Sequence, residues 1–202
     1  MDNRPGVKGA GTARNTGLEH AFGKYIFFAD ADDTLCPDFP IALSDYMDKE
    51  YDIVFFLSTS SAAADGSHKG RHLPYYRLVN DYLHTPSPKS ELRLRYKFCV
   101  PWAKLYRHDF LDENHLRFDA THRSEDLYFS TLAGSLAKCI AADARVVYCV
   151  NYNDNSLTAS VDRQSLFHHY KAENRCYYYM ERKLGPRKMK LLGYSPASHL
   201  TV

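Results

Sequence analysis

Two short apolar runs stand out in the first sixty residues, and a helical pattern separates them. Tyr25–Ala29 and Ile53–Leu57 are aromatic and β-branched, which is typical of strands buried on both faces. Between them, after Pro37, the apolar residues recur with helical spacing: Phe39, Ala42, Leu43, Tyr46 and Met47. Strand, helix and strand in this order form a βαβ unit. We therefore predict an α/β fold with a mixed, mostly parallel sheet.

Helical spacing dominates the rest of the chain. Short helices are predicted at Tyr75–Leu83 and Ser90–Tyr96, with a third beginning after the N-cap Ser124. Two short extended segments are predicted at Trp102–Tyr106 and Val146–Val150. A last helical stripe ends at Gly185-Pro186 and comprises Leu166, Tyr170, Tyr177, Met180 and Leu184.

Composition indicates an ordinary soluble domain. The 202 residues are 45% hydrophobic and 25% charged. No apolar run approaches the ~20 residues of a membrane-spanning helix, and the first residues do not resemble a secretory signal. The five cysteines are odd in number and never spaced as C-x-x-C, which indicates reduced thiols in a cytoplasmic protein.

The net charge of +2 hides an asymmetry. Residues 163–190 carry eight Lys and Arg but two Asp and Glu, so the rest of the chain is slightly acidic. A near-neutral body argues against a nucleic-acid-binding protein. The basic, aromatic stretch 166–190 allows two interpretations. It either packs on the domain through its tyrosines or rests on the inner face of an anionic membrane as a peripheral contact.

Three carboxylates follow the first predicted strand directly. Asp30, Asp32 and Asp33 lie where that strand leaves the sheet, which is where α/β proteins gather ligands. Carboxylates at this density repel one another unless a cation neutralises them, and hard oxygen ligands favour Mg²⁺ or Mn²⁺ together with phosphate oxygens. The alternative is that these residues form Asx turns and cap the next helix.

A glycine-rich segment precedes the carboxylates. Gly9 and Gly11 come just before a predicted short helix that carries Arg14 and ends near Gly23. Glycines at such a place let backbone N–H groups approach a phosphate, and an arginine suits a diphosphate. Alone, this segment is equally compatible with a flexible turn before a helix.

Taken together, these segments resemble a known family. Residues 9–33 read G-x-G-x-A-R-N-x-G-L-E-x-A-x-G-K-Y-I-x-F-x-D-x-D-D, which is similar to the central block of the family 2 glycosyltransferases of the GT-A fold. Three later blocks resemble the acceptor half of that family in the expected order: residues 102–107, 116–118 and 124–129.

The resemblance implies a GT-A-like (Rossmann-like) sheet flanked by helices and an enzyme that transfers a sugar. The donor would be a nucleotide diphosphate sugar and the acceptor a hydroxyl of a glycan or lipid-linked molecule, with inversion, in bacterial-type surface polysaccharide or glycan synthesis. In this resemblance Asp32 ligates the Mn²⁺ or Mg²⁺ on the diphosphate. Asp30 lies against the nucleotide sugar, and Asp33 lies beside the metal or the donor sugar.

Further roles follow for the remaining motif residues. Arg14 and Asn15 match the A-R-N block near the donor pocket. Asp126 is the expected general base for the acceptor hydroxyl, supported by Glu125, although two acids also suit the first turn of any helix. Trp102 and His122 are candidates for acceptor binding, with core packing as the alternative for Trp102.

The resemblance also divides the chain. Residues 1–160 are expected to form a partial GT-A domain, with a donor and metal half at 1–60 and an acceptor half at 61–160, followed by a basic helical extension at 161–202. The family begins with an apolar strand that ends in a P-x-Y-N-like motif. Because this sequence starts beyond that motif, we expect an N-terminally truncated chain whose own activity is open.

Two rival interpretations remain. Residues 30–35 also match D-x-D-x-T-L of haloacid dehalogenase-like phosphohydrolases, in which Asp30 would be the nucleophile and Asp32 the acid/base, with Ser58 or Thr59 binding phosphate. The later lysine and paired-acid motifs of that family have no convincing counterpart here. A third interpretation is an inactive fragment or binding remnant of a glycosyltransferase.

Overall fold

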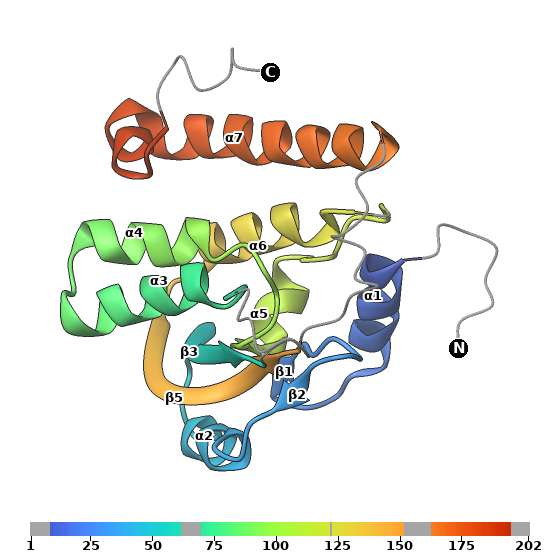
Figure 1. The fold of residues 1–202 in the computed structure, drawn as a ribbon, viewed down its shortest axis with the longest axis vertical. Helices are drawn as coiled ribbons and strands as arrows, with labels where there is room; N and C mark the ends of the chain where they lie inside the picture. The colour runs from blue at the N-terminus through green and yellow to red at the C-terminus, as the bar shows by residue number, and fades with distance from the viewer. Residues whose placement is uncertain (1–8, 62–69, 122, 152–162, 195–202) are drawn as a thin grey trace.

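The computed structural model describes residues 9–61, 70–121, 123–151 and 163–194, which form a sheet with helices on both faces (Figure 1). The strands are β1 (Tyr25–Phe27), β2 (Thr34–Leu35), β3 (Ile53–Ser60), β4 (Lys104–Arg107) and β5 (Ile140–Val150). Their order across the sheet is β1-β4-β3-β5-β2. The predicted α/β class with a mixed sheet is therefore confirmed.

The expectation of a mostly parallel sheet is wrong. Only the β3–β5 pairing is parallel among the described strands, whereas β1–β4, β3–β4 and β2–β5 are antiparallel. The predicted βαβ unit is present as β1, α2 (Phe39–Tyr46) and β3, but β4 lies between its two strands and pairs antiparallel with both. An antiparallel insertion of this kind comes from a distant segment, so the local pattern could not reveal it.

The two apolar runs have different places in the sheet. Ile53–Leu57 lies in the central strand β3 and is at most 6% exposed, as predicted for a strand covered on both faces. β1 is half-buried, because it forms one edge of the sheet. Burial of the first run on both faces is thus a second prediction that the structure corrects.

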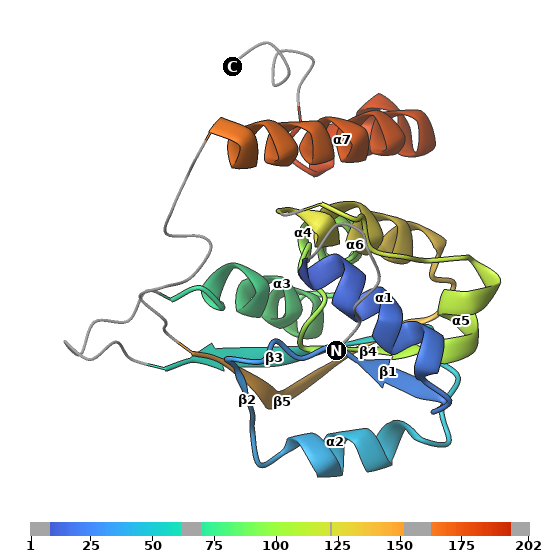
Figure 2. The same cartoon turned by 90° about the vertical axis from the view of Figure 1, so that its right-hand side faces the viewer.

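Helices cover the sheet unevenly. α2 lies on one face, while α1 (Ala10–His20), α3 (Leu73–His84) and α5 (His108–Glu113) lie on the other (Figure 2). Beyond them come α4 (Pro88–Lys97) and α6 (Glu125–Leu136), and α7 (Arg163–Leu191) forms the outermost layer over that pair (Figures 1 and 2). α7 is interrupted at Gly185, which has φ 72°, just before Pro186, where the sequence predicted an end. No described helix combines the length and apolarity needed to cross a membrane.

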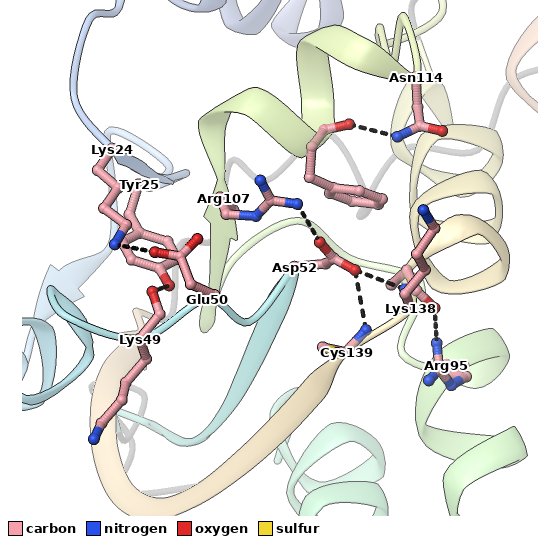
Figure 3. Close-up of polar contacts among 12 residues, drawn as sticks. Lys24, Tyr25, Lys49, Glu50, Asp52, Arg95, Arg107, Asn114, Lys138 and Cys139 are labelled. Atoms are coloured by element: carbon pink, nitrogen blue, oxygen red, sulfur yellow. Dashed lines mark hydrogen bonds and ion pairs between the residues drawn. The ribbon is translucent and has the colours of Figure 1, made fainter.

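One buried carboxylate joins three strands at the end of the sheet opposite the acidic cluster. Asp52 accepts hydrogen bonds from Arg107 Nη2 at 2.6 Å and from the backbone N–H groups of Lys138 and Cys139 at 2.6 and 3.0 Å (Figure 3). Burial alone raises the pKa of Asp52, but these donors outweigh burial and hold it below its ordinary value. The start of β3 is thereby tied to β4 and to the entry of β5.

Candidate active site

The aspartate cluster forms a tight turn between β1 and β2. The backbone N–H of Asp33 donates to the carbonyl of Asp30 at 3.1 Å, which closes a four-residue turn. β2 is short, and it pairs with the end of β5 through Thr34 opposite Cys149 and Leu35 opposite Tyr148. The carboxylates therefore lie beside the last residues of β5, a strand more than a hundred positions later in the chain.

Two residues at the end of β5 hold the turn. The buried Tyr148 hydroxyl donates to Asp33 Oδ2 at 2.7 Å and accepts from the backbone N–H of Asp30 at 2.9 Å. Asn151 donates from its backbone to Asp33 Oδ1 at 2.8 Å and from its amide to the carbonyl of Asp32 at 2.8 Å. Sequence reasoning missed both residues, because neither belongs to a motif and a tyrosine in a strand is an ordinary core residue.

The three aspartates consequently have three different environments. Both carboxylate oxygens of Asp33 accept protein hydrogen bonds, and burial nevertheless raises its pKa. Asp30 is half-buried and paired with Arg14. The Asp32 side chain is exposed and makes no hydrogen bond or ion pair with the described residues. Asp33 thus holds the turn, and Asp32 presents the available carboxylate.

Arg14 bridges the two groups of acids that the sequence places far apart. Its Nη2 lies 2.5 Å from Asp30 Oδ1 and its Nη1 lies 2.8 Å from Glu125 Oε1. The side chain is 13% exposed, and its guanidinium carbon lies 5.4 Å from the centre of the Phe118 ring. Burial lowers the pKa of Arg14, but the two carboxylates outweigh burial and raise it, so the bridge stays charged.

Asp126 lies next to this bridge, in the first turn of α6. Burial raises the pKa of Asp126 to about 7, and the charge of Glu125 adds to that shift while Arg14 opposes it. The buried Lys104 and Tyr106 and the half-buried Tyr75 and Cys99 are close enough to interact with its charge. A carboxyl group with a pKa near neutrality is suited to accept a proton at physiological pH.

Lys104 is another residue that sequence reasoning missed. It is 2% exposed, its Nζ donates to the Phe98 carbonyl at 2.6 Å, and burial lowers its pKa to about 7. A lysine inside the otherwise apolar Trp102–Tyr106 segment was the available signal.

The A-R-N block contains a structural residue beside Arg14. The Asn15 amide donates to the Phe118 carbonyl at 2.9 Å and accepts from the Phe118 N–H at 2.8 Å. Both polar ends of the side chain bond to the Phe118 backbone, so Asn15 joins α1 to this segment, and its expected contact with a donor stays a prediction.

The glycines at the start of α1 allow close packing. A Cβ on Gly11 would lie 2.3 Å from the carbonyl oxygen of Asp119 and 3.0 Å from Glu125, and a Cβ on Gly9 would lie 3.2 Å from Thr121. Close approach of α1 to the loop before α6 is therefore the physical reason for glycine at these positions. The expected approach to a phosphate is not required to explain them.

The two acceptor candidates have different outcomes. Trp102 is 5% exposed, stacks on Tyr148 with ring centres 5.4 Å apart and meets Tyr75 edge-on. This is the core-packing alternative, and little of the indole is left for an acceptor to touch. Trp102 instead supports the tyrosine that holds the aspartate turn. His122 lies outside the described residues.

The donor set is compatible with a metal ion completed by a substrate. Among the described residues, no group of three or more His, Cys, Asp or Glu side chains is placed to hold a metal ion. Mg²⁺ commonly takes one or two carboxylates together with substrate phosphates. The exposed carboxylate of Asp32 fits that mode of binding, whereas a site made of protein ligands alone does not fit.

Comparison with known proteins identifies the family of the chain. The sequence profile described as glycosyl transferase family 2 matches residues 2–114. The uncharacterized glycosyltransferase YibD of Escherichia coli strain K12 is 29% identical over 130 residues, which cover 61% of this chain and 36% of YibD. The chain thus spans little more than a third of that relative.

Solved structures show the same fold. The S. aureus protein TarS, as residues 1–349 in complex with UDP-GlcNAc, superposes with a TM-score of 0.67 at 19% identity and covers 95% of this chain and 52% of its own length. The crystal structure of S. aureus TarS gives a TM-score of 0.62 at 18% identity, with 95% and 30% covered. These likenesses support the GT-A-like arrangement predicted from the sequence.

Substitution of two glycines of α1 tests the packing argument. We expect Gly11→Ala to lower the free energy of unfolding by about 1–3 kcal/mol, because the new methyl group overlaps the Asp119 carbonyl. Gly17→Ala is the matched control, since its methyl group meets nothing within 4 Å. That variant should gain about 1 kcal/mol from helix propensity. Urea denaturation of both variants measures the difference, and two changes of the same sign would contradict the argument.

Proposed function

The chain belongs to glycosyl transferase family 2, and from that premise we propose that its site transfers a sugar from a nucleotide diphosphate donor to an acceptor hydroxyl. The proposal rests on the position of Arg14, which forms ion pairs with Asp30 of the aspartate turn and with Glu125 at the start of α6 and so holds two acidic clusters together. One group contains an exposed carboxylate, Asp32, and the other contains Asp126, whose pKa is raised to about 7. Diphosphate neutralisation and proton removal are the two requirements of this reaction.

Asp32 is the residue that we propose to hold a divalent cation, Mn²⁺ or Mg²⁺. Such an ion supplies positive charge to the diphosphate as the bond to the sugar breaks. The ion pair of Asp30 with Arg14 fixes the position of the turn, and Asp33 fixes it to β5 through the hydroxyl of Tyr148. The complex of TarS with UDP-GlcNAc supports a nucleotide-sugar donor for this chain as well.

Asp126 is the proposed general base. The acceptor oxygen forms a bond to the anomeric carbon while the bond from that carbon to the diphosphate breaks, and the acceptor proton passes to Asp126. A single displacement of this kind inverts the anomeric centre. Glu125 keeps Arg14 beside the base through its 2.8 Å contact. A glycan or lipid-linked acceptor in polysaccharide synthesis is the proposed substrate class.

The phosphohydrolase alternative receives no support from these observations. It needs Asp30 as a nucleophile, whereas Asp30 is engaged by Arg14. It also needs Ser58 or Thr59 as a phosphate ligand, and Ser58 is 2% exposed. The match to glycosyl transferase family 2 covers the shared motif.

We also propose a peripheral membrane contact through α7. The helix exposes Leu166, Phe167, Tyr170 and Tyr178. Eight basic residues and two acidic residues occur in 163–190, and an anionic surface complements that balance. The described part of α7 therefore offers both the apolar and the basic groups that a monotopic helix uses.

The proposed base predicts opposite effects on activity and stability. Asp126→Asn should lower transfer by roughly 10²–10⁴-fold, and the rate of the unaltered chain should rise with pH through about 7. Because the folded pKa is raised, the charged carboxylate destabilises the fold above pH 7, and that cost disappears as the pH falls toward the ordinary value of 3.8. Asp126→Asn should therefore raise the melting temperature at pH 8 and not at pH 4.

The control for this pair of measurements is Asp109→Asn, which removes an exposed acid from the first turn of α5. Full transfer activity in Asp126→Asn would eliminate the assignment of the base. An equal gain in melting temperature at both pH values would contradict the raised pKa.

The proposed metal ligand predicts cooperative binding of two ligands. UDP with Mn²⁺ should raise the melting temperature of the chain, whereas either one alone should do so less, because the cation and the diphosphate complete each other's coordination. Asp32→Asn should abolish the joint effect, and the exposed Asp48→Asn should retain it. If UDP with Mn²⁺ raised the melting temperature of Asp32→Asn as much as that of the unaltered chain, Asp32 would not belong to the site. If it did not raise the melting temperature of the unaltered chain, the interpretation as an inactive fragment or binding remnant would be favoured.

The membrane proposal predicts charge-dependent vesicle binding. The chain should sediment with vesicles containing phosphatidylserine and less with phosphatidylcholine alone. The triple variant Arg182→Glu, Lys183→Glu and Arg187→Glu should lose that difference, since all three side chains are exposed. No binding by the unaltered chain would rule out the contact.

A further inference from the structure

The two halves of α7 contact the rest of the fold in different ways. From Cys176 onward, apolar side chains pack against α4 and form a small core of their own: Leu92, Tyr96, Cys176, Tyr177, Met180, Met189 and Leu192. Residues 163–175 instead leave Leu166, Phe167 and Tyr170 exposed, and a cavity of about 290 Å³ separates their helix from residues 119–121. Specific polar contacts therefore join this half to the fold.

Arg175 makes two of these contacts. Its Nη1 donates to both carboxylate oxygens of Asp119, at 2.7 and 2.9 Å. Its guanidinium carbon also lies 3.5 Å from the centre of the Tyr128 ring, on the first turns of α6. Arg175 thus contacts one residue before Glu125 and Asp126, in the loop that leads to α6, and one residue after them, in α6 itself.

The loop that contains Asp119 also contacts Glu125, the first of the two acids. The backbone N–H of Asp119 donates to the carbonyl of Glu125 at 3.2 Å. The carbonyl of Asp119 faces Gly11 of α1, so this residue also sets how closely α1 approaches. A shift of Asp119 would be transmitted to Glu125 through one hydrogen bond and to Arg14 through the helix that carries it.

A second contact acts on the residue just before the acids. Ser124 has φ 59°, a left-handed conformation that costs a non-glycine residue of order 1 kcal/mol or more. Its hydroxyl makes no capping hydrogen bond, contrary to the usual role of an N-cap serine. The hydroxyl oxygen lies instead 2.7 Å from Nδ1 of His169 on α7.

From these contacts we propose that α7 is a positioning element for the Glu125–Asp126 pair, acting through Arg175 and His169. The proposal rests on the proposed function only in giving Asp126 its chemical role. Arg175 fixes the loop from the Asp119 side, and His169 fixes the strained residue at the start of α6. Neither residue touches a substrate in this scheme, so both are positioning residues.

Hydrogen exchange and a side-chain titration in the full chain test the proposal without requiring activity. In Arg175→Gln, protection of the Asp119 amide should fall about fivefold, from loss of one ion pair and one cation–π contact. The pKa of Asp126, followed by carboxyl ¹³C NMR, should move from about 7 toward the ordinary value as water enters. The matched control is Arg182→Gln, which removes the same charge from α7 at a residue bonded to its own helix through the Tyr178 carbonyl.

Unchanged Asp119 protection and Asp126 pKa in Arg175→Gln would overturn the proposal, as would equal changes in the control. A loss of global stability alone would lower the protection of core amides as well and would leave the Asp126 pKa of the folded molecules unchanged. Arg175→Lys should recover part of the effect, because the ion pair returns without the planar group over Tyr128.

The His169 contact has its own test. His169→Ala should lower protection of the Leu127 amide, which donates to the carbonyl of Ser124 at 3.4 Å. The double variant with Ser124→Gly should restore that protection, because glycine adopts a positive φ without support. Failure of glycine to restore protection would remove His169 from the scheme. If Asp126→Asn kept full transfer activity, the proposed function would fail while these structural readouts could still succeed, so the two failures are distinguishable.

Discussion

The contact of Arg14 with two acids is the interaction on which the site depends. Asp30 comes from the turn after β1 and Glu125 from the start of α6, and each would repel the other without the guanidinium between them. Arg14 itself is fixed in α1, which reaches the loop before α6 because Gly11 has no side chain. The Arg14 guanidinium therefore sets the distance between the aspartate turn, where the sugar donor is proposed to bind, and Asp126, the proposed base.

This constraint explains why a single motif contains residues of two kinds. The Asp32 side chain is exposed and makes no hydrogen bond or ion pair with the described residues, which leaves its carboxylate available for the proposed cation. The side chains of Asn15 and Asp33 are also polar, but they form hydrogen bonds with Phe118, Tyr148 and Asn151. A sequence motif therefore contains residues available to a ligand as well as residues that hold those residues in place. Only the three-dimensional contacts distinguish the two kinds.

The elements of the fold could be predicted from the sequence because their signals are local. The strand at Ile53, the helix after Pro37 and the helix after Ser124 follow from spacing, caps and breaks. Strand direction depends on which distant segment pairs with which, so the insertion of β4 between β1 and β3 left no local trace. The same limit hid Tyr148, whose hydroxyl acts on residues 115 and 118 positions away.

The buried position of Asp126, the proposed base, carries a free-energy cost that other parts of the fold must offset. Asp126 is held where its charge is unfavourable, and Ser124 before it adopts a conformation that glycine would adopt more readily. The sheet is secured independently at its other end, where Asp52 joins three strands. Strain at the acid pair is therefore local, and contacts from outside the sheet are needed to resist it. α7 supplies such contacts through Arg175 and His169, so the outermost helix of the structure supports the proposed site.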